Sequence, residues 1–171
     1  MLLRALIACV GSGLLALSLS GCGGSNSEGE EQSACISPTA YQQPALYSIM
    51  EAGGQASSLQ ISSNTDGSYQ TILIKNGSQT KGSINFNQGR ECEKSVNPLT
   101  VEERILVYGN IDFDTIAQSY FSAPVIRQSF NPLRYSNGEQ LDVEVSEDSK
   151  GRILSLTIMH GQMLVYSIKL T

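Results

Sequence analysis

Apolar and polar residues alternate along three stretches in the first half of the chain, and a period of two is typical of a β-strand with one buried face. The stretches are residues 57–62, 69–75 and 78–87. Asp66-Gly67 separates the first two, and Asn76-Gly77 separates the last two. Both dipeptides favour tight hairpin turns, because the central residues of such turns take positive φ angles. The pattern therefore predicts three antiparallel strands in sequence order.

A two-residue loop at Asp66-Gly67 implies a particular pairing of the first two strands. It places Ile61 opposite Ile72 and Leu59 opposite Ile74. Four aliphatic side chains then share one face of the sheet, which favours this register.

The last third of the chain repeats the alternation. Turns are expected at residues 146–151 and at His160-Gly161. The alternating apolar positions are Leu141, Val143 and Val145, then Leu154, Leu156 and Ile158, then Leu164, Tyr166, Ile168 and Leu170. We expect a three-stranded antiparallel meander with one apolar face.

Helix signals lie between these two groups of strands. Thr100 and Glu103 have the spacing of a capping box, in which the hydroxyl accepts a helical N–H and the carboxylate reaches back to the cap. The box predicts a helix over residues 101–108 that ends at Gly109.

A second short helix is expected over residues 115–121, with Asp114 as its cap. Residues 104–113 also fit one strand with a bulge at Gly109, so the strand remains an alternative to the first helix. Taken together, the patterns predict a mainly β fold: a small antiparallel sheet or sandwich, or a partly open barrel, with one or two short helices. An α+β fold is the alternative.

The beginning of the chain does not show this alternation of apolar and polar residues. Residues 5–19 are mostly apolar, Arg4 precedes them, and the run Leu19-Ser20-Gly21-Cys22 follows. A stretch of this length is too short to span a bilayer core, which needs about 20 helical residues. The segment resembles a bacterial lipoprotein signal peptide with its lipobox, and such segments are set aside when the fold is predicted.

This resemblance implies that residues 1–21 are removed and that Cys22 carries diacylglycerol and palmitate as the first residue of the mature protein. It implies a lipid anchor in the cell membrane. Where two membranes are present, Gly23 in place of aspartate implies the outer membrane, facing the periplasm. Where there is one membrane, its outer leaflet is implied.

Residues 23–34 are polar and acidic and contain almost no side chain to bury. We expect residues 22–34 to be the lipidated cysteine and a flexible acidic tether that spans at most about 35–40 Å. The remaining residues, 35–171, are expected to form a single β-rich domain.

Charge and cysteine content limit the classes of function. All of the 16 acidic residues and all but Arg4 of the 11 basic residues follow the signal segment, and this acidic excess argues against nucleic-acid binding. Cys9 leaves with the signal segment, so Cys35 and Cys92 remain beside the lipidated residue. In an exported protein such a pair predicts one disulfide, with two unpaired thiols as the alternative.

Catalytic and metal-binding patterns are weak. His160 is the single histidine, expected in a solvated turn, so no histidine-based metal cluster and no histidine-centred triad is predicted. Asp112 and Asp114 begin like a calcium loop, but the positions that require Gly and Glu hold Thr115 and Phe121. A looser calcium site is the alternative to a helix cap or a solvated strand. We expect no cofactor, no metal and no enzymatic activity.

A loop-like stretch over residues 122–138 is the candidate partner or ligand surface, since functional residues concentrate on loops. Aromatic side chains cluster at and near it: Tyr120, Phe121, Phe130 and Tyr135.

The expected function is that of a lipid-anchored cell-envelope protein, a non-enzymatic binding or accessory module with an envelope protein as its partner. The alternative is a periplasmic carrier of a small apolar ligand. Its β-barrel-like cavity is then lined by aliphatic residues of both strand groups, such as Leu59, Ile72, Leu154 and Ile158.

Overall fold

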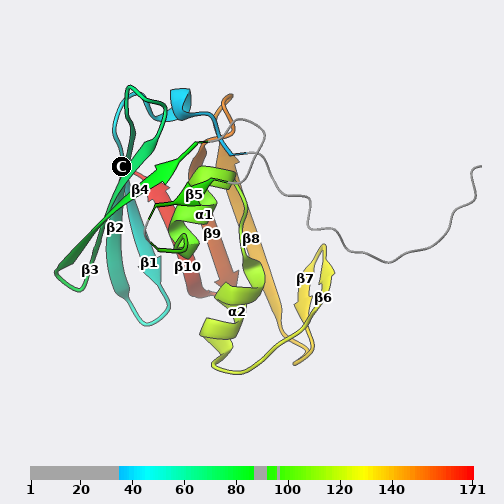
Figure 1. The fold of residues 1–171 in the computed structure, drawn as a ribbon. Coiled ribbons are helices and arrows are strands. Elements are labelled where there is room, and N and C mark those ends of the chain that lie inside the picture. The colour runs from blue at the N-terminus through cyan, green and yellow to red at the C-terminus, as the bar shows by residue number, and fades with distance from the viewer. Residues whose placement is uncertain (1–34, 87–91, 96) are drawn as a thin grey trace, which may run out of the picture. The chain divides into compact units, whose positions relative to one another are not determined.

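The computed structural model describes residues 35–86, 92–95 and 97–171, and Figure 1 shows their arrangement. These residues form ten antiparallel strands, two α-helices and one short 3-10 helix. The elements in chain order are η1 (Pro38–Tyr41), β1 (Ala45–Glu51), β2 (Gln55–Ser63), β3 (Tyr69–Lys75), β4 (Ser78–Asn85), β5 (Glu93–Lys94), α1 (Val101–Tyr108), α2 (Phe113–Phe121), β6 (Arg127–Phe130), β7 (Leu133–Tyr135), β8 (Gln140–Glu147), β9 (Ile153–His160) and β10 (Met163–Leu170).

The sheet consists of two meanders that meet in its middle. Its strand order is β5-β4-β3-β2-β1-β10-β9-β8-β7-β6. The first meander, β1–β5, runs from the middle of the sheet to one edge, and the second, β6–β10, runs from the other edge back to the middle. The two join where the first and last strands pair, with Ile49 opposite Ile168. The sheet is not closed, because β5 and β6 stand at its opposite ends. The predicted mainly β fold is confirmed, in the form of one unclosed antiparallel sheet with two short helices.

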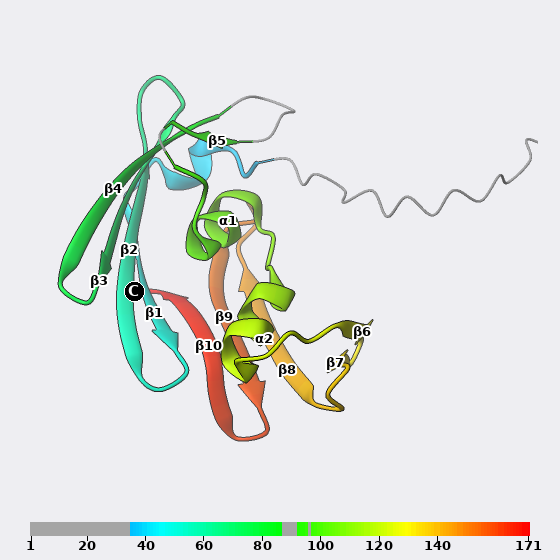
Figure 2. The same cartoon turned by 60° about the horizontal axis from the view of Figure 1, so that its bottom comes forward.

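Both helices lie against the same face of this sheet (Figure 2). Along β1 every second side chain, at Ala45, Tyr47 and Ile49, points to this face and is buried. The buried residues of the helices complete the core: Ile105, Leu106 and Val107 from α1, and Ile116 and Ala117 from α2.

The capping box of α1 is confirmed. The Glu103 backbone N–H donates to the Thr100 hydroxyl at 3.2 Å, and the Thr100 backbone N–H donates to the Glu103 carboxylate at 3.0 Å. Gly109 ends the helix with φ 67°, a left-handed conformation that glycine adopts without steric cost. The alternative of a strand across residues 104–113 is therefore wrong.

The second helix is also present, but its predicted cap is wrong. Asp112, and not Asp114, accepts the backbone N–H of Thr115, at 3.0 Å, so α2 begins at Phe113. Asp114 lies inside the first turn, where its carboxylate pairs with Arg127 at 3.3 Å.

The predicted pairing of β2 with β3 is wrong by one residue. In the structure Ile61 pairs with Thr71, and Leu59 pairs with Leu73. Since alternate residues of a strand point to opposite faces, this shift places Ile72 and Ile74 on the face away from the helices.

The cause is the length of the connecting loop. The Asn64 backbone N–H donates to the Ser68 carbonyl at 2.8 Å, and the Gly67 N–H donates to the Asn64 carbonyl at 3.1 Å. The loop therefore contains three residues, with Gly67 at φ 82°, which is a common hairpin form. The Asp66 carboxylate stabilises it by accepting the Ser68 N–H at 2.8 Å. The second predicted turn, Asn76-Gly77, is the expected two-residue loop.

Strand β1 and the hairpin β6–β7 were not expected from the sequence. Strand β1 precedes the first predicted strand, and it joins the two meanders. The hairpin β6–β7 lies within residues 122–138, so the prediction that this stretch is loop-like is wrong for the residues in these two strands. Both strands of the hairpin are short.

A buried ion pair connects α1 to the first meander. Lys94 Nζ lies 2.9 Å from Glu103 Oε2, and the Thr71 hydroxyl donates to Glu103 Oε1 at 2.7 Å. Gly82 leaves room for this network, because a Cβ at that position would lie 2.6 Å from Thr71 Oγ1 and 2.8 Å from Lys94 Cε.

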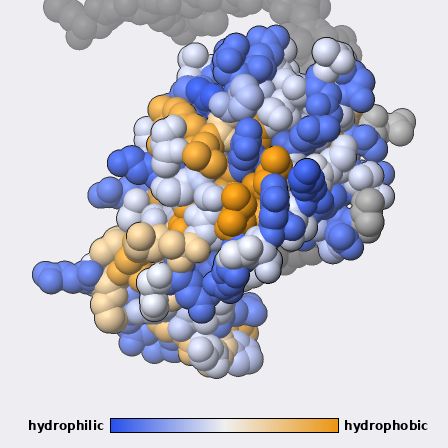
Figure 3. Space-filling view, turned by 90° about the vertical axis from the view of Figure 1, so that its left-hand side faces the viewer, coloured by the Kyte–Doolittle hydropathy of each residue, from blue (hydrophilic) through white to orange (hydrophobic). Residues whose placement is uncertain are grey.

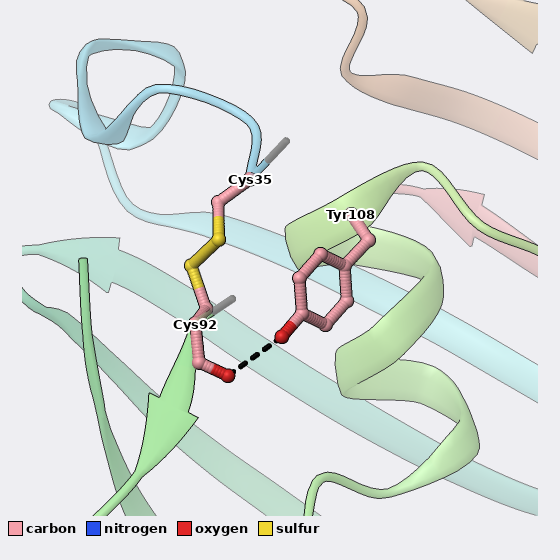
Figure 4. The surroundings of a disulfide bond; sticks show 3 residues. All are labelled: Cys35, Cys92 and Tyr108. Atoms are coloured by element: carbon pink, nitrogen blue, oxygen red, sulfur yellow. Dashed lines mark hydrogen bonds between the residues drawn. A yellow bond between two sulfur atoms is a disulfide. The ribbon is translucent and has the colours of Figure 1, made fainter. Parts of the chain in front are cut away.

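The predicted disulfide between Cys35 and Cys92 is present, with the two Cα atoms 6.1 Å apart. Figure 4 shows Tyr108 of α1 beside it, with its hydroxyl donating to the Cys92 carbonyl at 2.6 Å. The Ile36 N–H donates to the Val107 carbonyl at 2.7 Å. The disulfide therefore joins two segments that also contact the end of α1.

Cys22 and the expected tether lie outside the described residues. Among the residues that are described, none of the helices combines the length and apolar character that crossing a membrane requires.

Candidate functional site

Three of the four aromatic residues expected at a binding surface lie together. Tyr120 and Phe121 are at the end of α2, and their ring centroids are 5.0 Å apart. Tyr135 on β7 meets the Phe121 ring edge-on at 6.1 Å. Tyr135 is fully buried, so it supports this site from beneath and does not itself contribute to the surface.

His160 belongs to the same group, although the sequence predicts a solvated turn for it. Its ring packs edge-on against Tyr120 and against Phe121, with centroids 5.6 Å apart in both cases. Its Nδ1 lies 3.1 Å from the Tyr120 hydroxyl, and its Nε2 lies 2.7 Å from a carboxylate oxygen of Glu139. Both ring nitrogens are therefore hydrogen-bonded.

We call Tyr120, Phe121, Tyr135, Glu139 and His160 the aromatic corner. Three segments far apart in the chain supply it: the end of α2, the β7–β8 region and the end of β9. Helix α2 packs against β10, and β10 pairs with β9, so the fold brings the segments together. No local sequence pattern indicates Glu139 or His160, because their partners are distant in the chain.

Tyr135 anchors the aromatic corner to α2. Its hydroxyl donates to the Phe113 carbonyl at 3.0 Å. Burial raises the pKa of Tyr135 to about 12, and the nearby Asp114 carboxylate adds to this rise. The phenol is therefore neutral in the folded protein at pH values where an exposed tyrosine ionises.

Replacing Tyr135 with phenylalanine tests this anchor. At pH 7 the variant is expected to lose about 1 kcal/mol of unfolding free energy, the net value of one hydrogen bond. Between pH 10 and the raised pKa of about 12, unfolded tyrosine releases its proton while folded Tyr135 keeps it. Stability thus falls as pH rises, by about 1.4 kcal/mol per pH unit for this residue. Tyr135→Phe should lose that contribution and show a flatter decline in urea unfolding measured across this range. An unchanged slope would contradict the raised pKa.

Phe130, the fourth expected residue, has a different neighbour. The guanidinium of Arg127 stacks over its ring, 3.6 Å from the centroid. Arg127 also pairs with Asp114, which connects the β6–β7 hairpin to α2.

Exposed apolar side chains are found on several parts of the molecule. Met163 is exposed beside the aromatic corner, where it pairs with His160 across the β9–β10 turn. Ile126 and Phe130 are exposed on the segment that contains the β6–β7 hairpin. Others, such as Leu46 and Met50, lie on the sheet face away from the helices. Figure 3, a view from the side of β2–β4, shows apolar groups separated by polar ones. Single exposed apolar residues among polar neighbours are normal for a protein surface.

The residues expected to line a ligand cavity do not share one face. Leu59 and Ile158 are fully buried in the core that the helices cover. Ile72 lies on the opposite face because of the shifted register. A carrier would fold the core face of the sheet around its ligand. In this structure α1 and α2 pack against that face (Figure 2).

The polar groups of the aromatic corner are linked to one another. Glu139, His160 and Tyr120 form a chain of hydrogen bonds that fixes the ring orientations. A tyrosine hydroxyl occupies the place that a serine or cysteine nucleophile takes in a hydrolytic triad. Within the described part of the chain, no three His, Cys, Asp or Glu residues are grouped so that they could hold a metal ion.

Comparison with known proteins adds no relative, since no protein-family model, no curated protein and no solved structure matches the chain.

Proposed function

We propose that this protein is a lipid-anchored cell-envelope protein and acts as a non-enzymatic binding or accessory module in an envelope assembly. The lipid on Cys22 holds the domain at the membrane, which is the outer membrane facing the periplasm where two membranes are present. The aromatic corner binds the partner protein.

The observation that carries this proposal is the fixed arrangement of the aromatic corner. Tyr120, Phe121 and His160 are partly exposed, and the Tyr120–His160–Glu139 hydrogen bonds hold them in place. Side chains that are ordered before binding lose less conformational entropy on association. Exposed Met163 beside them adds a residue type that is enriched at protein interfaces.

The lipid anchor is tested by replacing Cys22 with alanine. The wild-type protein is expected to incorporate labelled palmitate and to sediment with membranes. The variant should do neither, because the single acceptor thiol of the lipobox is gone. Palmitate incorporation that persists in the variant would contradict the anchor.

The binding surface is tested by placing a photo-crosslinking amino acid at Met163 in intact cells. Met50, also an exposed methionine but on the far face of the sheet, is the matched control. We expect Met163→benzoylphenylalanine to form a covalent adduct with one envelope protein, and Met50→benzoylphenylalanine to form none. The adduct should weaken when Glu139→Gln is added, because the corner loses the carboxylate that orients His160. Equal labelling from both positions would contradict the proposal.

A further inference from the structure

The segment over residues 122–138 differs in charge from the rest of the chain. It contains two arginines, Arg127 and Arg134, and none of the 16 acidic residues of a chain with net charge −5. A negatively charged surface therefore repels most of this protein but attracts this segment.

The same segment exposes the most accessible large apolar side chains of the described residues. Ile126 is 74% exposed and Phe130 is 68% exposed. Arg127 stacks on the Phe130 ring, which places a cation over one face of an exposed aromatic ring. Apolar groups bordered by arginine are suited to the boundary between lipid head groups and acyl chains.

The position of these residues makes them accessible. Strand β6 is the last strand of the sheet, and both views of the fold show the β6–β7 hairpin at the margin, away from β1–β4. We call Ile126, Arg127, Phe130 and Arg134 the hairpin rim.

The length of chain before the domain limits its distance from a bilayer. Only residues 23–34 separate Cys22 from Cys35, and this tether spans at most about 35–40 Å when fully extended. A domain of this size has a radius of gyration of about 14 Å. The tether therefore lets any face turn toward the membrane but keeps the domain beside it.

We propose that the hairpin rim inserts into the head-group region of the membrane that carries the Cys22 lipid. The partner of this surface is a lipid bilayer. Phe130 and Ile126 enter the boundary with the acyl chains, while Arg134 meets lipid phosphates and the acidic remainder of the domain faces away. The proposal rests on the lipid anchor of the proposed function, and it leaves the aromatic corner free for a protein partner.

The test uses the mature, lipidated protein in vesicles of phosphatidylethanolamine and phosphatidylglycerol. Because the chain contains no tryptophan, Phe130→Trp introduces a single tryptophan at the rim, whose emission is separated from that of the tyrosines by selective excitation. Gln79→Trp, at an exposed position of β4 near the opposite edge of the sheet, is the matched control. We expect the emission of Phe130→Trp to shift to shorter wavelength and to lose most of its intensity when the lipids carry brominated acyl chains. The Gln79→Trp emission should change little.

Adding Arg134→Glu to Phe130→Trp is expected to reduce the quenching, because it reverses a charge that faces the phosphates. Unquenched Phe130→Trp in protein that floats with the vesicles would overturn the membrane contact and leave the anchor intact. Protein that does not float would overturn the anchor, and the membrane contact with it.

Discussion

Replacing Lys94 with methionine is expected to lower the free energy of unfolding by about 3–5 kcal/mol, the usual cost of breaking a buried ion pair. The side chains of Lys94 and Glu103 are only 6% and 2% exposed. Methionine fills nearly the same volume but carries no charge, so the Glu103 carboxylate remains buried without its cation. The Thr71 hydroxyl and the Thr100 N–H still donate to it, but neither neutralises it.

A second pair in the same meander supplies the matched control. Lys75 pairs with Glu51, and these side chains are 39% and 29% exposed. Water screens this pair, so Lys75→Met is expected to cost less than about 1 kcal/mol. Urea unfolding followed by circular dichroism measures both variants.

A double variant separates the charge from the contacts. Lys94→Met combined with Glu103→Gln removes both charges and should recover part of the loss seen in Lys94→Met alone. If Lys94→Met is no more destabilising than Lys75→Met, the Lys94–Glu103 pair does not contribute through its burial.

Removing the Cys35–Cys92 disulfide is the second change with a large expected effect. The two cysteines are 57 residues apart in the sequence. In the chain-entropy model, opening a loop of this length costs about 4 kcal/mol, since the unfolded chain gains conformational freedom. This is a large part of the roughly 5–15 kcal/mol that stabilises a typical domain.

Guanidinium unfolding of Cys35→Ser/Cys92→Ser, compared with the wild type, measures the loss. Reductant should destabilise the wild type to the level of the variant after both are refolded from denaturant, and it should leave the variant unchanged. The intact mass of the oxidised wild type should be two hydrogens below that of the reduced chain. Equal stability of variant and wild type under oxidising conditions would contradict the assigned role.

Local signals predicted several elements of this fold. The capping box at Thr100 and Glu103 predicted α1 together with its end at Gly109. The apolar alternation of the last third predicted β8, β9 and β10, and Asn76-Gly77 predicted its two-residue turn. Each of these features depends on interactions between residues only a few positions apart, so the local sequence is enough to predict it.

The errors arose where the decisive contact is not visible in such a pattern. The β2–β3 register depends on whether the loop holds two or three residues, and the Asn64–Ser68 hydrogen bond decides this. Asp112 caps α2 in place of the predicted Asp114. The Asp114 carboxylate instead pairs with Arg127, which lies on β6.

By itself, the sequence determined the antiparallel β character of the fold and the helix that begins at the capping box, because turn residues, caps and strand periodicity act over short distances. It also predicted the Cys35–Cys92 disulfide from the cysteine content. Only the tertiary structure decided which face of each strand is buried, that β1 pairs with β10, and that His160 meets Tyr120 and Glu139. The β1–β10 pairing joins residues more than a hundred positions apart, and His160 lies 40 residues from Tyr120 and 21 from Glu139. At such separations the packing of a shared core, and not any local preference, selects the contact.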